Sequence, residues 1–134
     1  MSEPEDNAAP RHCLVVDDSR VVRKAARRFM EGFGFTVREA ADGQEALTAC
    51  RDLLPEIVLL DWNMPVMDGL SFLKAARAEF DAEHPVIMLC TTEIAMERIM
   101  AALEAGAQEY VVVREELGFR ARRAVLRAVE APAR

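Results

Sequence analysis

Short apolar runs alternate five times with longer segments of helical periodicity along this chain of 134 residues. A strand followed by a helix, repeated in this way, is typical of a parallel sheet that is covered by helices on both faces. We therefore predict the α/β class, with a doubly wound five-stranded parallel sheet. The predicted strands are 13–16, 35–40, 56–61, 85–90 and 109–113, and the predicted helices are 20–32, 42–53, 70–80, 93–106 and an arginine-rich segment that begins at 114.

The length is that of one domain with a single core. We expect a disordered tail over 1–11, the folded domain over 12–130 and a short C-terminal tail over 131–134. No apolar run is long enough to span a bilayer, and the first residues lack the apolar stretch of a secretion signal. These features predict a cytoplasmic protein without membrane insertion.

Three cysteines, Cys13, Cys50 and Cys90, lie within or beside apolar runs and show no CxxC spacing. A metal–thiolate site is therefore not expected, and the cysteines fit small buried side chains in a reducing compartment.

Polar side chains follow three of the predicted strands. Asp17 and Asp18 come after the first strand, Asp61 ends the third, and Thr91 follows the fourth. In parallel sheets, ligands bind outside the carboxyl ends of the strands, so these side chains are expected to converge there. Crowded carboxylates raise one another's proton affinity and favour a cation, and Mg²⁺ prefers oxygen ligands.

With a metal beside it, a carboxylate such as Asp61 can act as a nucleophile toward a phosphoryl donor, and the hydroxyl of Thr91 can donate to a phosphoryl oxygen. The alternative is that Asp17 and Asp18 form only a turn, with Ser19 or Asp18 capping the helix that follows.

Four motifs in this order are similar to those of the receiver domain of bacterial response regulators. They are VVDDS (15–19), DWNMPVMDG (61–69), TTE (91–93) and ALEAGAQEYVV (102–112). The resemblance covers roughly 12–130 and is strongest to single-domain, CheY-like proteins. It implies the flavodoxin-like fold of receivers and a signalling role rather than an enzymatic one.

The resemblance implies specific roles around Asp61. This residue would accept a phosphoryl group from a histidine kinase. Asp18, Asp61 and the backbone carbonyl of Asn63 would bind Mg²⁺ directly, and Asp17 would bind it through water.

Other matching positions would respond to the phosphoryl group or shape the loop. Thr91 would hydrogen-bond a phosphoryl oxygen, and Tyr110 would swing inward in the active state. Pro65 and Gly69 would shape the loop after Asp61, with Asp68 between them.

One residue of the family pattern is missing. Receivers carry a lysine at the end of the fifth strand, where it pairs with the phosphoryl group, but this chain has Val113 there, followed by Arg114. A lost charged hydrogen bond costs about 1.5–3 kcal/mol. If it forms only in the active state, the switch shifts roughly 10- to 100-fold toward inactive. Either Arg114 compensates, or phosphorylation is not the main input.

The C-terminal segment has the opposite charge to the rest of the chain. The whole protein has a formal charge of −6, yet from Arg114 onward there are six arginines and three glutamates. Arginine clamps phosphate and also pairs with the edge of guanine. The segment is similar to the arginine-rich stretch of CheY-like proteins that bind cyclic di-GMP. Candidate ligands are Arg114, Arg120, Arg122, Arg123 and Arg127.

Two other interpretations of this segment stay open, a solvated face and a surface that binds a protein. Periodicity does not decide whether Phe119 and Leu126 point outward among the arginines or inward onto the sheet.

We predict a monomeric, stand-alone response regulator of motility or chemotaxis, phosphorylated on Asp61 with Mg²⁺. It would act by docking to a motility or flagellar-motor protein through the face of the fourth helix, fifth strand and fifth helix, and would not bind nucleic acid. The alternatives are a cyclic di-GMP effector with secondary phosphorylation, and a phosphate sink that drains a kinase without a docking partner.

Overall fold

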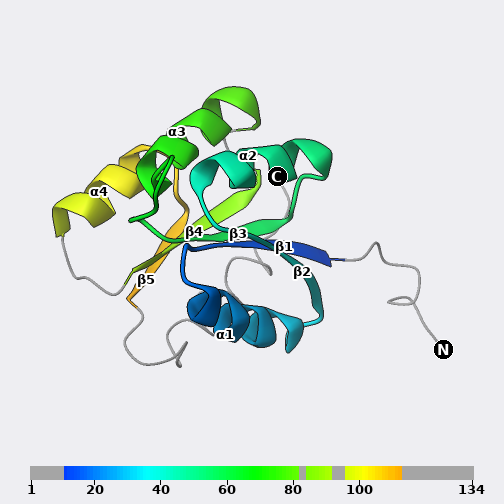
Figure 1. Ribbon diagram of the computed structural model, residues 1–134. Coiled ribbons are helices and arrows are strands. Elements are labelled where there is room, and N and C mark those ends of the chain that lie inside the picture. Colours follow the sequence, from blue (N-terminus) through cyan, green and yellow to red (C-terminus); the bar gives the residue numbers. More distant parts are fainter. Residues whose placement is uncertain (1–10, 82–83, 92–95, 113–134) are drawn as a thin grey trace.

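The computed structural model describes residues 11–81, 84–91 and 96–112 (Figure 1). Within them, strands and helices alternate along the chain as the sequence predicts. The elements are β1 (Arg11–Val16), α1 (Arg20–Glu31), β2 (Phe35–Ala40), α2 (Gly43–Asp52), β3 (Ile57–Leu60), α3 (Gly69–Glu79), β4 (Val86–Thr91), α4 (Met96–Glu104) and β5 (Glu109–Val112).

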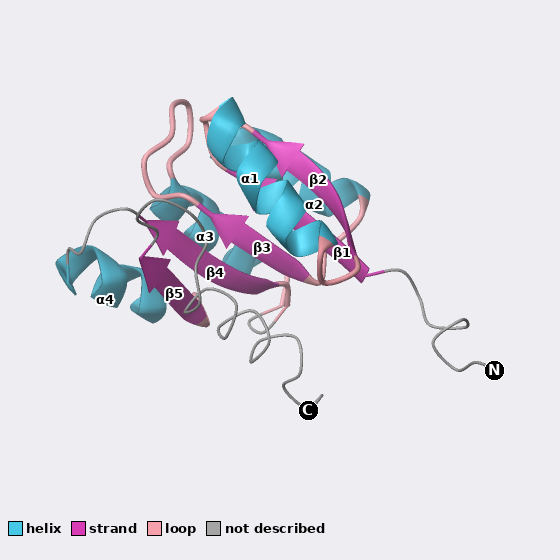
Figure 2. Ribbon diagram, turned by 90° about the horizontal axis from the view of Figure 1, so that it is seen from below, coloured by secondary structure: helices cyan, strands magenta, loops and turns pink. Residues whose placement is uncertain are grey.

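The five strands are parallel and lie in the order β2-β1-β3-β4-β5. Figure 1 shows α2, α3 and α4 on one face of the sheet and α1 on the other. In Figure 2, which is seen from below, α1 lies in front of the sheet. The predicted fold class is thereby confirmed. The strand order reverses between β1 and β3, which places the switch point of the fold at the carboxyl ends of these two strands.

Most predicted boundaries lie within one or two residues of those in the structure. The largest difference in a strand is at β1, which begins at Arg11 rather than at Cys13. Arg11 pairs with Phe35 in the sheet, its guanidinium lies 4.9 Å from the centre of the Phe35 ring, and it donates to both carboxylate oxygens of Glu56. These contacts hold a residue that we had expected in the tail.

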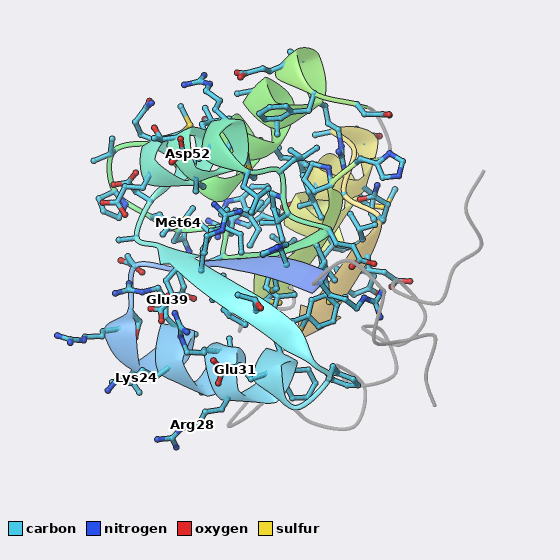
Figure 3. All side chains as sticks on the ribbon, turned by 90° about the vertical axis from the view of Figure 1, so that its right-hand side faces the viewer. Lys24, Arg28, Glu31, Glu39, Asp52 and Met64 are labelled. Atoms are coloured by element: carbon cyan, nitrogen blue, oxygen red, sulfur yellow. The ribbon has the colours of Figure 1, made fainter. Side chains whose placement is uncertain are left out.

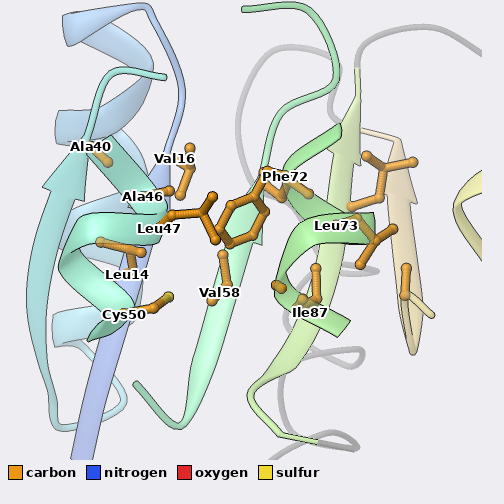
Figure 4. Close-up of a cluster of buried hydrophobic side chains, with 14 of the residues drawn as sticks. Leu14, Val16, Ala40, Ala46, Leu47, Cys50, Val58, Phe72, Leu73 and Ile87 are labelled. Carbon is orange, nitrogen blue, oxygen red and sulfur yellow. The ribbon is translucent and has the colours of Figure 1, made fainter. Parts of the chain in front are cut away.

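Strand β3 and residues 13–16 of β1 are apolar throughout because both of their sides are buried. Alternate residues of each strand point to the two faces. On the face of α2 and α3, Leu14, Val58 and Ile87 meet Leu47 and Phe72 (Figure 4). On the opposite face, the buried cluster consists of Cys13, Val15, Ala26, Met30, Phe35, Val37, Ile57, Leu59 and Met88.

Helix α1 buries Ala26 and Met30, and Phe29 packs against the same cluster. An apolar side with Val21, Ala25 and Phe29 would fit the helical period equally well. Val21 is 78 % exposed. In a helix this rich in alanine and arginine, a rotation of one residue changes the apolar stripe very little, so periodicity does not decide it.

Among the described residues, no helix combines the length and the apolar character that a membrane crossing requires. The arginine-rich segment and the predicted fifth helix lie outside the described residues.

Candidate functional site

The carboxylates of Asp17, Asp18 and Asp61 meet at the carboxyl ends of β1 and β3. One oxygen of each lies within 4.8 Å of the others. The backbone places them there, because the N–H of Asp17 donates to Ala40 (3.1 Å) and the N–H of Asp61 donates to Val16 (2.9 Å), which continues the ladder past the strand ends. The predicted convergence of the three acids is therefore observed.

Ser19 forms the cap of α1, which resolves the alternative left open by the sequence. Its hydroxyl accepts from the N–H of Val22 (3.2 Å). Its own N–H donates to the Asp17 carboxylate (2.8 Å), so Asp17 is oriented by the turn. Asp18 does not cap the helix, and its side chain is exposed beside the two half-buried acids. The Asp17–Asp18 pair thus contributes to a cluster as well as to a turn.

The negative charges of the three acids repel one another, which affects their pKa values. Burial, together with the charges of Asp17 and Asp18, raises the pKa of Asp61 to about 6, although N–H groups of Trp62 and Asn63 oppose the shift. Burial is also the main cause that raises the pKa of Asp17, while the hydrogen bond from Ser19 lowers it. Like charges at this distance favour either a proton or a cation between them.

The donor set fits Mg²⁺. Carboxylate oxygens are the ligands that this ion prefers, and its reluctance to lose water suits a site that is open on the side of Asp18. None of the three acids has a lysine or arginine side chain at ion-pair distance among the described residues. A divalent cation would supply the positive charge that this cluster lacks.

The loop between β3 and α3 is tightly packed against Asp61. The N–H of Trp62 donates to the Asp61 carboxylate (2.8 Å), and the N–H of Gly69 donates to the carbonyl of Trp62 (2.8 Å). A Cβ at Gly69 would collide with the carbonyl oxygen of Asp61. Asp68 caps α3 by accepting from the N–H of Ser71 (2.9 Å). The loop-shaping role expected for Gly69 is thus a steric one.

Arg23, which the sequence analysis did not single out for the site, holds the backbone of Asp17 in place. It donates to the backbone carbonyl of Asp17 (2.7 Å) and to the carboxylate of Glu39 (2.9 Å). Glu39 also accepts from Arg27 (2.7 Å). In Figure 3, Lys24 and Arg28 point away from the sheet on the same helix. Only the position of Arg23 in the first turn after the cap could have indicated its role.

The roles expected of Thr91, Tyr110 and Asn63 stay predictions. Thr91 ends β4 and pairs with Val112 of β5, at the same edge as the acids. The side chain of Tyr110 is 42 % exposed. Asn63 is exposed, and its side-chain oxygen accepts from Arg98 (3.5 Å).

Val113 and all five candidate arginines, Arg114, Arg120, Arg122, Arg123 and Arg127, lie outside the described residues. The compensation for the missing lysine and the binding of cyclic di-GMP therefore stay predictions.

The cysteines are structural, as expected. Cys13 and Cys50 are buried in the two apolar clusters, and Cys90 packs against one of them. Burial raises the pKa of Cys50 to about 11 and that of Cys90 to about 12, so these thiols stay protonated at neutral pH.

Comparison of the fold with solved structures identifies close neighbours. The chemotaxis response regulator CheY4 of Vibrio cholerae superposes with a TM-score of 0.80 at 29 % identity, over 90 % of this chain and 99 % of that protein. A response regulator from Chloroflexus aurantiacus gives a TM-score of 0.76 at 29 % identity, over 89 % of this chain and 94 % of that protein.

Among curated proteins, the transcriptional regulatory protein PrrA of Mycobacterium tuberculosis is 42 % identical over 99 residues, which cover 74 % of this chain. The chain spans less than half of that relative, because the matched part is 42 % of its length. The name of this relative implies action on transcription, which differs from the expectation that the chain binds no nucleic acid. The difference is a weak one, because the match covers only 42 % of the relative.

The family model of the response regulator receiver domain matches residues 13–116. Receivers are signalling domains rather than enzymes, in agreement with the expectation from the sequence. The motifs around Asp17 and Asp61, the strand order and these similarities lead to one conclusion: the chain belongs to the response regulator receiver domain family and is a receiver domain of two-component signalling.

Proposed function

We propose that the chain is a phosphorylation-controlled switch in which Asp61 accepts a phosphoryl group from a histidine kinase. The observation that carries this proposal is the convergence of Asp17, Asp18 and Asp61 at the switch point of the sheet. No folding requirement explains three carboxylates at this distance, since their mutual repulsion destabilises the fold. A bound cation would offset this repulsion, and it would also attract the anionic phosphoryl group that Asp61 is proposed to accept.

Asp61 is suited to be the acceptor because it is half-buried and still ionised. With a pKa of about 6, the carboxyl is mostly charged at neutral pH. An oxygen of this carboxylate would form a bond to phosphorus while the P–N bond of a phosphohistidine breaks, and the imidazole nitrogen would keep the electron pair. Its second oxygen is held by the N–H of Trp62, which restricts the side chain to one orientation.

Asp17, Asp18, Asp61 and the backbone carbonyl of Asn63 would hold Mg²⁺, with Asp17 acting through water. When bound, the ion would supply positive charge to offset the phosphoryl oxygens. Thr91 would donate to one of these oxygens, and Tyr110 would move from its exposed position toward the sheet.

Uptake of phosphate from a small donor such as acetyl phosphate tests the proposal. We expect Mg²⁺-dependent incorporation of one phosphoryl group in the native chain and none in Asp61→Asn. A lack of incorporation by the native chain at saturating Mg²⁺ would contradict the proposal.

The output is proposed to be docking of a partner protein through the face that includes α4 and β5. Met96, Met100, Leu103 and Tyr110 expose apolar surface there. Similarity to a chemotaxis response regulator supports a motility or flagellar-motor partner, whereas similarity to a transcriptional regulator points to a different output. A pull-down with phosphorylated protein separates a docking switch from a phosphate sink, which would have no partner. The cytoplasm as the place of action and the monomeric state stay part of this proposal.

A second candidate function is that of a cyclic di-GMP effector, which the charge of the C-terminal segment favours. A calorimetric titration with cyclic di-GMP tests it, with the Arg120→Ala, Arg123→Ala double variant beside the native chain. Micromolar binding that the double variant loses would support an arginine site. An absence of binding would leave these arginines as a solvated or protein-binding face.

A further inference from the structure

Arg98 of α4 contacts both residues that follow Asp61. Its guanidinium lies 5.6 Å from the centre of the Trp62 ring, within the range of a cation–π interaction, and it donates to the side-chain oxygen of Asn63 (3.5 Å). Trp62 itself donates its backbone N–H to the Asp61 carboxylate. A single side chain therefore connects α4 with the loop that carries the site.

Helix α4 itself buries little of its surface in the part of the chain that the structure describes. Of its nine residues, only Ile99 and Ala102 are buried. Met96 is 62 % exposed and Met100 is 49 % exposed. Because the helix buries little apolar surface among the described residues, the contacts of Arg98 add to what positions it there.

We propose that Arg98 is a positioning residue that ties α4 to the loop at Asp61, so that the state of the site and the position of α4 depend on each other. The inference rests on the proposed function of Asp61, since it assigns a route by which that site would influence the α4 surface. If a ligand at the site changes the contact between Arg98 and this loop, then by linkage a change at α4 alters the site by the same factor.

The planar guanidinium suits this position. It can cover the Trp62 ring with its face while an N–H at its edge donates to Asn63. Lysine retains a cation for the ring but cannot make both contacts in the same geometry. The conservative variant is therefore expected to restore the contact in part.

The first test uses the fluorescence of Trp62, which is the single tryptophan of the chain. In metal-free protein, we expect Arg98→Ala to raise the acrylamide quenching constant of Trp62, because loss of the guanidinium uncovers one face of the ring. Arg98→Lys should lie between the two. Arg28→Ala removes an equal charge from an exposed position on α1 and should leave quenching unchanged.

Equal quenching in Arg98→Ala and the native chain would overturn the proposal, and so would an equal rise in Arg28→Ala. If Arg98→Ala does not fold, Arg98→Lys and Arg98→Gln provide the same comparison with a long side chain. This test needs neither metal nor phosphate, so it is decided even if Asp61 accepts no phosphoryl group.

The second test measures the coupling. We would add Mg²⁺ and beryllium fluoride, a phosphoryl mimic, and follow hydrogen exchange of the α4 amides. We expect the exchange rates to change at least twofold in the native chain and by less than half as much in Arg98→Ala, although the Trp62 signal shows that both bind the mimic. An equal response of α4 in both proteins would overturn the coupling. Failure of the native chain to bind the mimic would count against the proposed function of Asp61 instead.

Discussion

Gly69 lies against the main chain of Asp61, with no room between them for a side chain. A Cβ at position 69 would collide with the carbonyl oxygen of Asp61 and would come within 3.0 Å of the Cα of Trp62. Glycine is required there for close approach of the backbone. The first residue of α3 can therefore pack directly against the main chain of Asp61.

Gly69→Ala should consequently damage both the fold and the site. We expect a loss of about 1–3 kcal/mol in the free energy of unfolding, as for an overpacked core, measured by urea denaturation. Gly32→Ala is the matched control, because Gly32 ends α1 with ordinary helical angles and its nearest neighbour to a new Cβ would be at 3.3 Å. If the two variants were equally stable, the proposed steric role of Gly69 would be wrong.

Asp61→Asn should stabilise the metal-free protein at pH 7. The substitution removes a charge that burial and two neighbouring carboxylates disfavour. After allowance for solvent screening at this half-exposed position, the gain should be about 1–2 kcal/mol in thermal or urea unfolding. Mg²⁺ should stabilise the native chain more than the variant. Asp52→Asn, at the exposed end of α2 (Figure 3), should leave the Mg²⁺ effect unchanged.

The difference in the free energy of unfolding between Asp61→Asn and the native chain should depend on pH in a defined direction. The pKa of Asp61 is about 6 in the folded state against 3.8 for the unperturbed carboxyl, so between these values the folded state binds more protons than the unfolded state. The contribution of this carboxyl is most favourable below about pH 4 and is lost as the pH rises through 6. The advantage of Asp61→Asn should therefore be small at pH 4 and reach its maximum near pH 7. An advantage that is constant over this range would contradict the assigned electrostatic cause.

Arg23→Ala should destabilise the fold by about 1–3 kcal/mol, because it leaves the carbonyl of Asp17 and one oxygen of Glu39 without their charged donor. The side chain of Arg23 is only 16 % exposed, so water replaces these bonds poorly. Lys24→Ala, one residue along the same helix and exposed, provides the control and should stay within about 0.5 kcal/mol of the native chain. Chemical denaturation of both variants in metal-free buffer would measure the difference.

Much of the site could be predicted because it depends on topology alone. Asp17 and Asp18 follow one predicted parallel strand and Asp61 ends another, and parallel strands bring their carboxyl ends to one edge. Arg23 and Arg98 could not be found in the same way. Both are arginines on amphipathic helices, and many arginines at such positions are simply solvated. Their partners are an Asp17 carbonyl and a Trp62 ring, and only the packing of helix against strand and loop brings these groups within reach.

By itself, the sequence determined the strand and helix order, the parallel sheet and the acidic edge, because these follow from apolar periodicity and from the residues at strand ends. The tertiary structure decided which side of α1 is buried, that Arg11 belongs to the sheet, and how α4 contacts the loop after Asp61. Those features depend on rotations of one residue and on single long-range contacts. Their free energies are of the order of 1 kcal/mol and leave no periodic trace along the chain.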